Sequence, residues 1–295
     1  MIEPSTAIQI CRFLHDSALL LLWGTAAFVA FLMPPSLAAQ MLIRLGIFPL
    51  AAAGVAVLTT VAALPLQAAA LGNGWPDAVD GATVYAVLVA SPFALFFQAQ
   101  AVAGLLLMLA FIRRADRRMG TVALASAVGL AGLALTGHAS MEDGLLRIAH
   151  RLNDIVHLLA GGAWLGALIP FVVVLRMLAV PEYHTAAQVA LRRFSNVGHG
   201  AVFLVLATGI VNSIMTLGRW PTDWSSPYLL MLTMKIAAVG MMTCLAIVNR
   251  YVFVPAIAEN PDAALLSIRR ASLVEILLGV AAIGLVAVFG TLDPT

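Results

Sequence analysis

One apolar stretch of the chain concentrates side chains that bind metals or move protons. It contains His150, Asp154 and His157, whose spacings of four and three residues place them on one face of a helix. The two histidines stand about 10 Å apart along the helix axis, too far to bind one ion in a straight helix. We therefore predict two successive metal ligands, His150 and His157, with Asp154 orienting an imidazole through its second nitrogen. The alternative is that these histidines only make hydrogen bonds between helices.

Further predicted ligands lie in other apolar stretches. His15 follows Cys11 by one helical turn, and His138 stands at the end of its stretch. Met231 and Met234 carry thioethers, which favour Cu(I) among the common metal ions. We include His15, His138, Met231 and Met234 in the predicted metal site, whereas Cys11 is interpreted as a small apolar packing residue.

Lys235 lies beside the two methionines. Its ammonium group would repel a metal cation, so we interpret it as the electrostatic partner of an acid such as Asp154. Met241 and Cys244, further along the same stretch, are interpreted as packing residues.

A second hypothesis belongs to a different class of protein. Pairs of histidines hold haem in helical membrane proteins, and His157 with His199, or His15 with His150, would supply the axial ligands. A third hypothesis is a structural subunit without a ligand. The sequence has no nucleotide-binding glycine loop, HExxH motif or nucleophile motif, so we predict that the protein is not an enzyme.

The elements that must position these residues are transmembrane helices. Hydrophobic residues make up 62% of the 295 positions and charged residues only 10%, against about 25% charged in a soluble domain. A net charge of +2, without basic residues clustered among aromatics, argues against nucleic acid binding. Because backbone polar groups in lipid must be satisfied within each segment, we predict an all-α, polytopic helical bundle surrounded by lipid. Residues 1–295 form a single transmembrane domain in this prediction.

Eight apolar stretches approach the roughly 20 residues that cross a bilayer. They cover residues 9–33, 42–66, 91–112, 120–138, 149–176, 192–217, 227–252 and 268–290. A short extra helix over 81–90 is expected on the outer surface. In the fifth stretch, Gly161, Gly162 and Gly166 are small enough to let another helix approach closely.

The distribution of basic residues predicts the orientation. Most of the 16 Lys and Arg residues flank the connections after the first, third, fifth and seventh stretches, including the cluster from Arg113 to Arg118. Cytoplasmic loops carry such an excess, so both termini are expected in the periplasm and the first stretch is expected to be retained as a helix. This orientation puts four of the six histidines, His15, His138, His150 and His157, in or at the outer leaflet.

An ordered set of short patterns resembles a known family. The run HRLNDIVHLLAGGAWLGAL, residues 150–168, is similar to the signature helix of the copper resistance protein D (CopD) family. Further similarity lies in Arg193-Phe194-Ser195, in Thr208-Gly209, from Lys235 through Asn249-Arg250-Tyr251, and at Pro255. The family pattern Trp-x-Gly-Gly-Leu reads Trp164-Leu165-Gly166-Ala167-Leu168 here, a change at a packing position.

The resemblance implies a multi-pass protein of the bacterial inner (plasma) membrane with a role in copper homeostasis. It implies copper as the ligand, either Cu(I) or Cu(II), and a periplasmic copper-binding partner of the CopC type. We therefore expect a permease that moves copper from periplasm to cytoplasm through an outer-leaflet His/Met site. The haem-binding redox protein remains the alternative.

Overall fold

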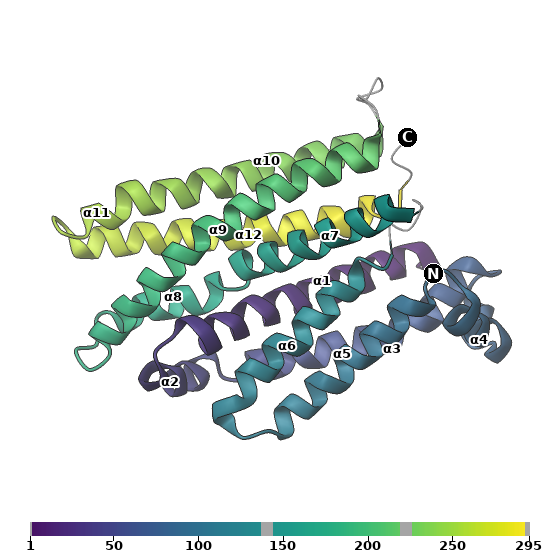
Figure 1. Ribbon diagram of the computed structural model, residues 1–295, viewed down its shortest axis with the longest axis horizontal. Coiled ribbons are helices and arrows are strands. Elements are labelled where there is room, and N and C mark those ends of the chain that lie inside the picture. Colours follow the sequence, from purple (N-terminus) through teal and green to yellow (C-terminus); the bar gives the residue numbers. More distant parts are fainter. Residues whose placement is uncertain (1, 137–143, 219–225, 293–295) are drawn as a thin grey trace.

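The computed structural model describes residues 2–136, 144–218 and 226–292, and all regular structure within them is helical (Figure 1). Seven helical segments are long and apolar enough to cross a membrane. They span Pro4–Leu32, Phe48–Leu71, Ala94–Ile112, Gly144–Met177, His184–Leu217, Pro227–Ala256 and Pro261–Phe289. The predicted all-α membrane bundle is therefore confirmed.

These segments contain the main helices of the bundle. Their bounds are α1 Pro4–Ala27, α3 Phe48–Leu71, α5 Ala94–Ile112, α7 Gly144–Leu165, α8 Leu168–Met177, α9 His184–Leu217, α10 Pro227–Val248, α11 Val254–Ala256 and α12 Pro261–Phe289. Shorter helices are α2 Pro35–Leu45, the turn η2 Trp75–Ala78 and α4 Gly81–Ala90. Two π-helical turns, η1 Phe28–Leu32 and η4 Asn249–Phe253, extend α1 and α10. Several of these helices begin with proline. Proline lacks a backbone N–H, and the N–H groups of the first turn have no acceptor within the helix, so no hydrogen bond is lost there.

The predicted span 120–138 corresponds to α6, Ala115–Leu133. Arg117 and Arg118 occupy its first turn, so its apolar part is shorter than the roughly 20 residues of a full crossing. α6 nevertheless packs along α5 and α1. The start of α1 and the end of α12 lie at the same end of the bundle, where Gln9 Nε2 donates to Thr291 Oγ1 at 3.0 Å. Seven segments of the described chain have the length and hydropathy of a membrane span, so an eighth pass through α6 stays a prediction.

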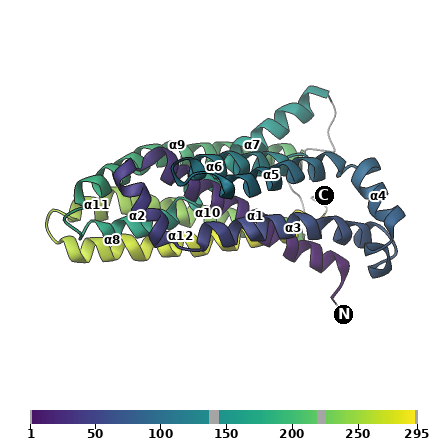
Figure 2. The ribbon, with the colours of Figure 1, turned by 90° about the horizontal axis from the view of Figure 1, so that it is seen from below.

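Several predicted boundaries differ from the structure. The predicted span 42–66 begins too early, because Gly46 adopts φ +55° and separates α2 from α3, which begins at Phe48. The span 149–176 is broken between α7 and α8, and α9 begins at His184 rather than at 192. The short helix expected over 81–90 is α4, which lies across the long helices at the same end as the start of α1 (Figure 2).

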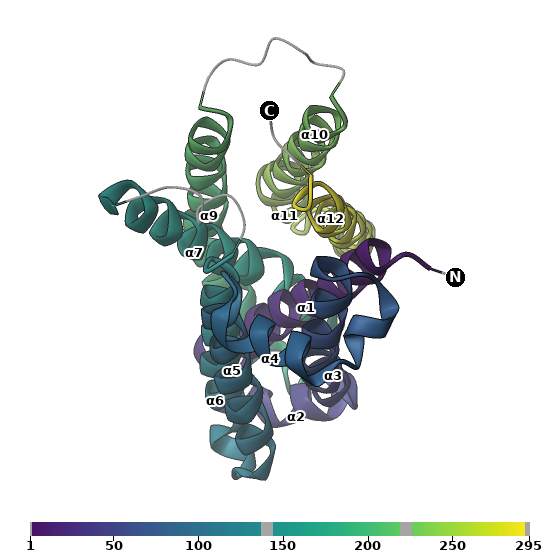
Figure 3. The same ribbon diagram turned by 90° about the vertical axis from the view of Figure 1, so that its right-hand side faces the viewer.

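Helix α1 is the centre of the bundle. Seen along its length, it lies between the α3, α5 and α6 group and the α7–α9 and α10–α12 pairs (Figure 3). Its contact with α7 is made by glycines, because a Cβ on Gly24 would lie 2.6 Å from Ala167 N and against the Gly162 carbonyl. Trp23 Nε1 donates to Leu159 O at 2.8 Å across the same contact. The predicted close approach is thus made by Gly162 and Gly166, and it fixes the position of α7.

Candidate metal-binding histidines

His157 is held against α9 by one ring nitrogen. Its Nδ1 lies 2.9 Å from Thr208 Oγ1, and the Thr208 hydroxyl in turn donates to the Leu204 carbonyl one turn earlier. Because this hydroxyl has one proton, its oxygen accepts the Nδ1–H of a neutral His157. The free lone pair of the ring is then on Nε2, and a neutral imidazole binds metals through such a nitrogen. Gly209 gives the ring room, since a Cβ there would lie 3.4 Å from His157 Cε1.

Amide side chains extend this contact between α7 and α9. Asn153 Nδ2 donates to Thr208 O at 2.9 Å and also to Asn212 Oδ1. Asn153 is one turn before His157 on the same face of α7. The polar face of α7 is therefore anchored to α9 at two successive turns.

One charged residue of α10, Lys235, acts on His157. Lys235 interacts electrostatically with both Asp154 and His157, as the sequence predicted for Asp154. Its Nζ lies 6.0 Å from the centre of the Phe289 ring. Met231, one turn before Lys235, packs in the small cluster that contains Phe289. One predicted methionine ligand thus lies on the face of α10 that carries Lys235.

His15 occupies a separate polar centre. Its Nδ1 lies 2.9 Å from Thr59 Oγ1 on α3, and its Nε2 lies 3.1 Å from Gln100 Oε1 on α5. Gln100 Nε2 donates to Gly129 O on α6 at 2.9 Å, which fixes its oxygen toward His15. Nε2 of a neutral His15 ring therefore carries the proton, and Nδ1 accepts from the Thr59 hydroxyl.

A cavity of about 600 Å³ opens beside this centre, at the end of the bundle where α1 begins. Cys11, His15 and Asp16 line it. Cys11 Sγ also approaches Thr59 O at 3.4 Å, so the cysteine and the histidine meet the same residue of α3. Cys11 lies one turn before His15, and Asp16 directly follows His15, so soft, borderline and hard ligands line one cavity, although the three are not close enough together to hold one ion.

The predicted ligands are distributed over several places. His15 faces α3 and α5, His157 faces α9, and His150 is buried on α7 with 2% of its surface exposed. Met234 is 52% exposed on the outside of α10. His138 lies outside the described residues. Within the described chain, no three His, Cys, Asp or Glu side chains are close enough together to hold one ion.

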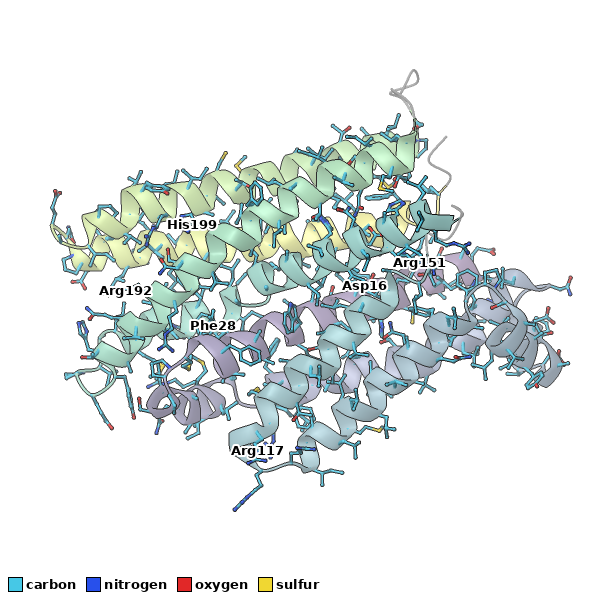
Figure 4. The ribbon with its side chains drawn as sticks, in the orientation of Figure 1. Asp16, Phe28, Arg117, Arg151, Arg192 and His199 are labelled. Atoms are coloured by element: carbon cyan, nitrogen blue, oxygen red, sulfur yellow. The ribbon has the colours of Figure 1, made fainter. Side chains whose placement is uncertain are left out.

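The structure separates the predicted haem pair of His157 and His199. His199 precedes Thr208 by nine residues on α9, about 14 Å along the axis and on the opposite face. Its ring instead lies against Tyr251, with Nε2 3.4 Å from the phenol oxygen. Figure 4 shows His199 in the half of the molecule that contains Arg192, whereas Asp16 lies in the half that contains Arg151.

Sequence reasoning missed the hydrogen-bonding partners of the histidines. Thr59, Gln100 and Thr208 are each at most 7% exposed, and each bonds a predicted ligand. A glutamine inside an apolar span was the available signal, because a polar group there needs a partner. Threonine gives no such signal, because its hydroxyl can bond to its own helix.

The fold and its buried histidines define a multi-pass membrane protein with polar centres inside the bilayer. Family models match residues 1–148, as copper resistance protein D-like, N-terminal domain, and residues 188–289, as copper resistance protein D. Copper resistance protein D of Pseudomonas syringae pv. tomato is 32% identical over 256 residues, covering 83% of this chain and 82% of that protein. The chain therefore belongs to the copper resistance protein D family.

A second relative indicates the membrane. Inner membrane protein YebZ of Escherichia coli (strain K12) is 29% identical over 289 residues, covering 96% of this chain and 97% of that protein. Together with the seven apolar helices, this similarity places the chain in the bacterial inner membrane. No solved structure matches the chain.

Proposed function

We propose that the protein is a copper permease that takes copper from the periplasmic side and passes it through the bundle to the cytoplasm. The observation that carries this proposal is the cavity that brings Cys11, His15 and Asp16 to one end of the molecule. In this proposal the cavity end faces the periplasm. The protein is then a carrier of copper rather than an enzyme.

The chemistry of the cavity suits copper. Thiol and imidazole groups bind Cu(I), and a carboxylate helps to balance the charge of the arriving ion. The His15 ring is bonded at both nitrogens, so copper would replace either Gln100 at Nε2 or Thr59 at Nδ1. The proton of the Cys11 thiol would be released when copper binds, because the thiolate is the ligand.

His157 is proposed as a later ligand on the pathway. Its Nδ1 is held by Thr208, which leaves Nε2 available to copper. His150 lies two turns earlier on α7, and Met231 lies on the face of α10 that carries Lys235. Asp154 reduces the repulsion of copper by Lys235 through its electrostatic interaction with that ammonium group. Met234 and His138 remain predicted ligands from the sequence.

A separate periplasmic copper-binding protein of the CopC type is proposed as the donor. It would deliver copper at the end of the bundle that contains the cavity and α4. A donor that holds copper tightly would remove the need for a methionine-rich capture segment on this chain.

Copper uptake into vesicles containing the purified protein tests the proposal. Cys11→Ser with His15→Ala should abolish uptake and lower the bound copper measured by elemental analysis. His157→Ala should abolish uptake while copper still binds in the cavity. Matched controls are Cys244→Ser and His199→Ala, which change exposed residues and should keep wild-type uptake. Undiminished uptake in the Cys11/His15 variant would overturn the proposed pathway, and a haem absorption band without copper would overturn the function.

A further inference from the structure

A carboxyl group lies at the middle of the last helix. Glu275 is the central residue of α12, with fourteen residues on either side, and only 2% of its surface is exposed. α12 contains the most apolar 18-residue stretch among the seven candidate spans. An ionised carboxylate at the centre of a bilayer is costly, so a buried acid at this depth marks a functional group.

Two N–H donors face this carboxyl. Asn249 Nδ2, from the first residue of η4, donates to Glu275 Oε1 at 3.0 Å. The indole N–H of Trp164, near the end of α7, faces the same group. Both donors stabilise the ionised form, because hydrogen bonds to a carboxylate are strong in a medium of low polarity.

No cation balances the charge within the described residues. The groups that face the carboxyl from α7 and η4, Trp164 and Asn249, do not titrate, and no charged side chain pairs with Glu275. The basic residues nearest in sequence are Arg250, beside Asn249, and Arg269 and Arg270. Hydrogen bonds without a counter-ion only partly offset the desolvation of a carboxylate.

Two oxygen atoms on residues close to Glu275 can accept a hydrogen bond. Asn249 Oδ1 and Ser272 Oγ are buried and have no hydrogen-bond partner in the described structure. Ser272 precedes Glu275 by three residues on α12, so the two side chains are neighbours on the helix surface. A protonated Glu275 has an O–H that needs an acceptor, and these two oxygens can supply one.

We infer that Glu275 is an intramembrane proton-binding site, at which a carboxylate takes up one proton from water and later releases it. The ionised form finds donors in Asn249 and Trp164, and the protonated form finds acceptors in Asn249 and Ser272. Both states are therefore accommodated by the same side chains. A metal ion would need several oxygen ligands, whereas N–H groups face this carboxyl.

The two side chains that face Glu275 both lie beside irregular parts of their helices. Asn249 begins a π-helical turn, and Trp164 lies two residues before the break between α7 and α8. Next to Trp164, Leu165 packs so closely on α12 that a Cβ on Gly279 would lie 2.8 Å from Leu165 Cδ2. Protonation changes the hydrogen bonds at both irregularities, which are the places where the helices can bend. Coupling of this proton to copper movement rests on the proposed function.

Infrared difference spectra of the purified full-length protein between acidic and alkaline pH test the site. The wild type should show the C=O stretch of a buried carboxylic acid that appears on acidification and exchanges slowly with deuterium. Glu275→Gln should lose this band, and Glu275→Asp should keep it at a shifted frequency. Glu259→Gln is the matched control, because Glu259 is exposed in the connection just before α12 and should leave the band unchanged.

The donors provide a second readout. Asn249→Leu removes a hydrogen bond to the carboxylate, whereas the protonated form keeps Ser272 as an acceptor. The midpoint of the infrared titration should therefore move to higher pH by about one unit. A band that persists in Glu275→Gln, or a midpoint unaffected by Asn249→Leu, would overturn the inference. Neither measurement uses copper, so a failure here is distinct from a failure of the proposed permease. In vesicles, Glu275→Gln should in addition abolish proton movement during copper uptake.

Discussion

The hydroxyl oxygen of Thr208 lies 2.9 Å from Nδ1 of His157 and determines which nitrogen of that ring carries the proton. The hydroxyl proton is directed to the backbone of α9, so the oxygen can only accept. A hydrogen bond that fixes the tautomer of a metal-binding histidine commonly changes its affinity for the metal 10- to 100-fold. His157 and Thr208 therefore form one hydrogen-bonded unit across two helices.

The first prediction is that Thr208→Val weakens copper binding at His157. Valine has nearly the shape of threonine but cannot accept the Nδ1–H, so the ring loses its preferred tautomer and orientation. We expect about a 10- to 100-fold loss of Cu(I) affinity, measured by competition with a coloured chelator. Because the cavity also binds copper in our proposal, the measurement is made in the Cys11→Ser and His15→Ala background.

Two controls separate this effect from a general disturbance of α9. Thr208→Ser keeps the acceptor and should keep most of the affinity. Ser213→Ala removes a hydroxyl that bonds only to the Gly209 carbonyl of its own helix, and should have no effect. Unchanged affinity in Thr208→Val would remove His157 from the copper pathway.

The fold followed from the sequence because lipid leaves few choices to an apolar segment. Segments rich in Leu, Ala and Val must form helices, and their lengths then indicate which of them can cross the bilayer. The errors fell where a local feature interrupts an apolar run. Gly46 separates α2 from α3. The carbonyl of Gly166, which has no N–H to accept from at Pro170, accepts from Thr25 Oγ1 at 3.0 Å instead. Such interruptions depend on neighbouring helices, which a single sequence does not reveal.

The site was only partly predictable for the same reason. Spacing along α7 placed His150, Asp154 and His157 on one face, but it could not show that His157 meets α9. It also could not show that His15 turns toward α3 and α5 rather than toward α7. Pairing between helices is decided by packing of small residues and by hydrogen bonds, neither of which has a fixed spacing in the sequence.

The second prediction concerns the glycine contact that positions α7. Gly24→Ala should destabilise the protein, because the added methyl group meets the Gly162 carbonyl and lies 2.6 Å from Gly166 Cα. The obstructing atoms are backbone, which cannot move aside without separating the two helices. A loss of about 1–3 kcal/mol is expected, seen as a lower midpoint of thermal unfolding in detergent.

Gly54→Ala is the matched control for this substitution. Gly54 also lies inside a transmembrane helix, but a Cβ there meets no atom within 4 Å. Alanine has the higher helix propensity, so this variant should be as stable as the wild type or slightly more stable. Equal unfolding midpoints for the Gly24 and Gly54 variants would show that the contact between α1 and α7 is looser than described.

The third prediction uses the pair of His15 and Gln100. Gln100→Leu leaves the buried Nε2–H of His15 without an acceptor, which should cost about 1–3 kcal/mol of unfolding free energy. Adding His15→Leu removes the orphaned donor, and the Thr59 hydroxyl can donate to the Val55 carbonyl instead. The double variant should therefore be more stable than Gln100→Leu alone, as chemical denaturation will show. Additive losses from the two substitutions would contradict the hydrogen bond between them.

The fourth prediction concerns pH and the first turn of α4. The hydroxyl of Thr83 donates to Asp80 Oδ2 at 2.6 Å and its backbone N–H donates at 2.8 Å, and these bonds lower the pKa of Asp80 below its ordinary value. A lowered pKa in the folded state means that the cap stabilises α4 fully above the unfolded pKa, near 4. The stabilisation is lost as pH falls through the lower, folded pKa.

Hydrogen exchange of the α4 amides, corrected for the intrinsic pH dependence of exchange, will measure this loss. Protection in the wild type should decrease below about pH 4, where the carboxyl begins to be protonated. Asp80→Asn keeps an oxygen that accepts from Thr83 but has no charge to lose, so its protection should not change over the same range. Asp80→Ala lacks the acceptor and should show weak protection at every pH. Protection that falls equally in the wild type and in Asp80→Asn would assign the pH dependence to another group, because only the wild type carries a titrating cap.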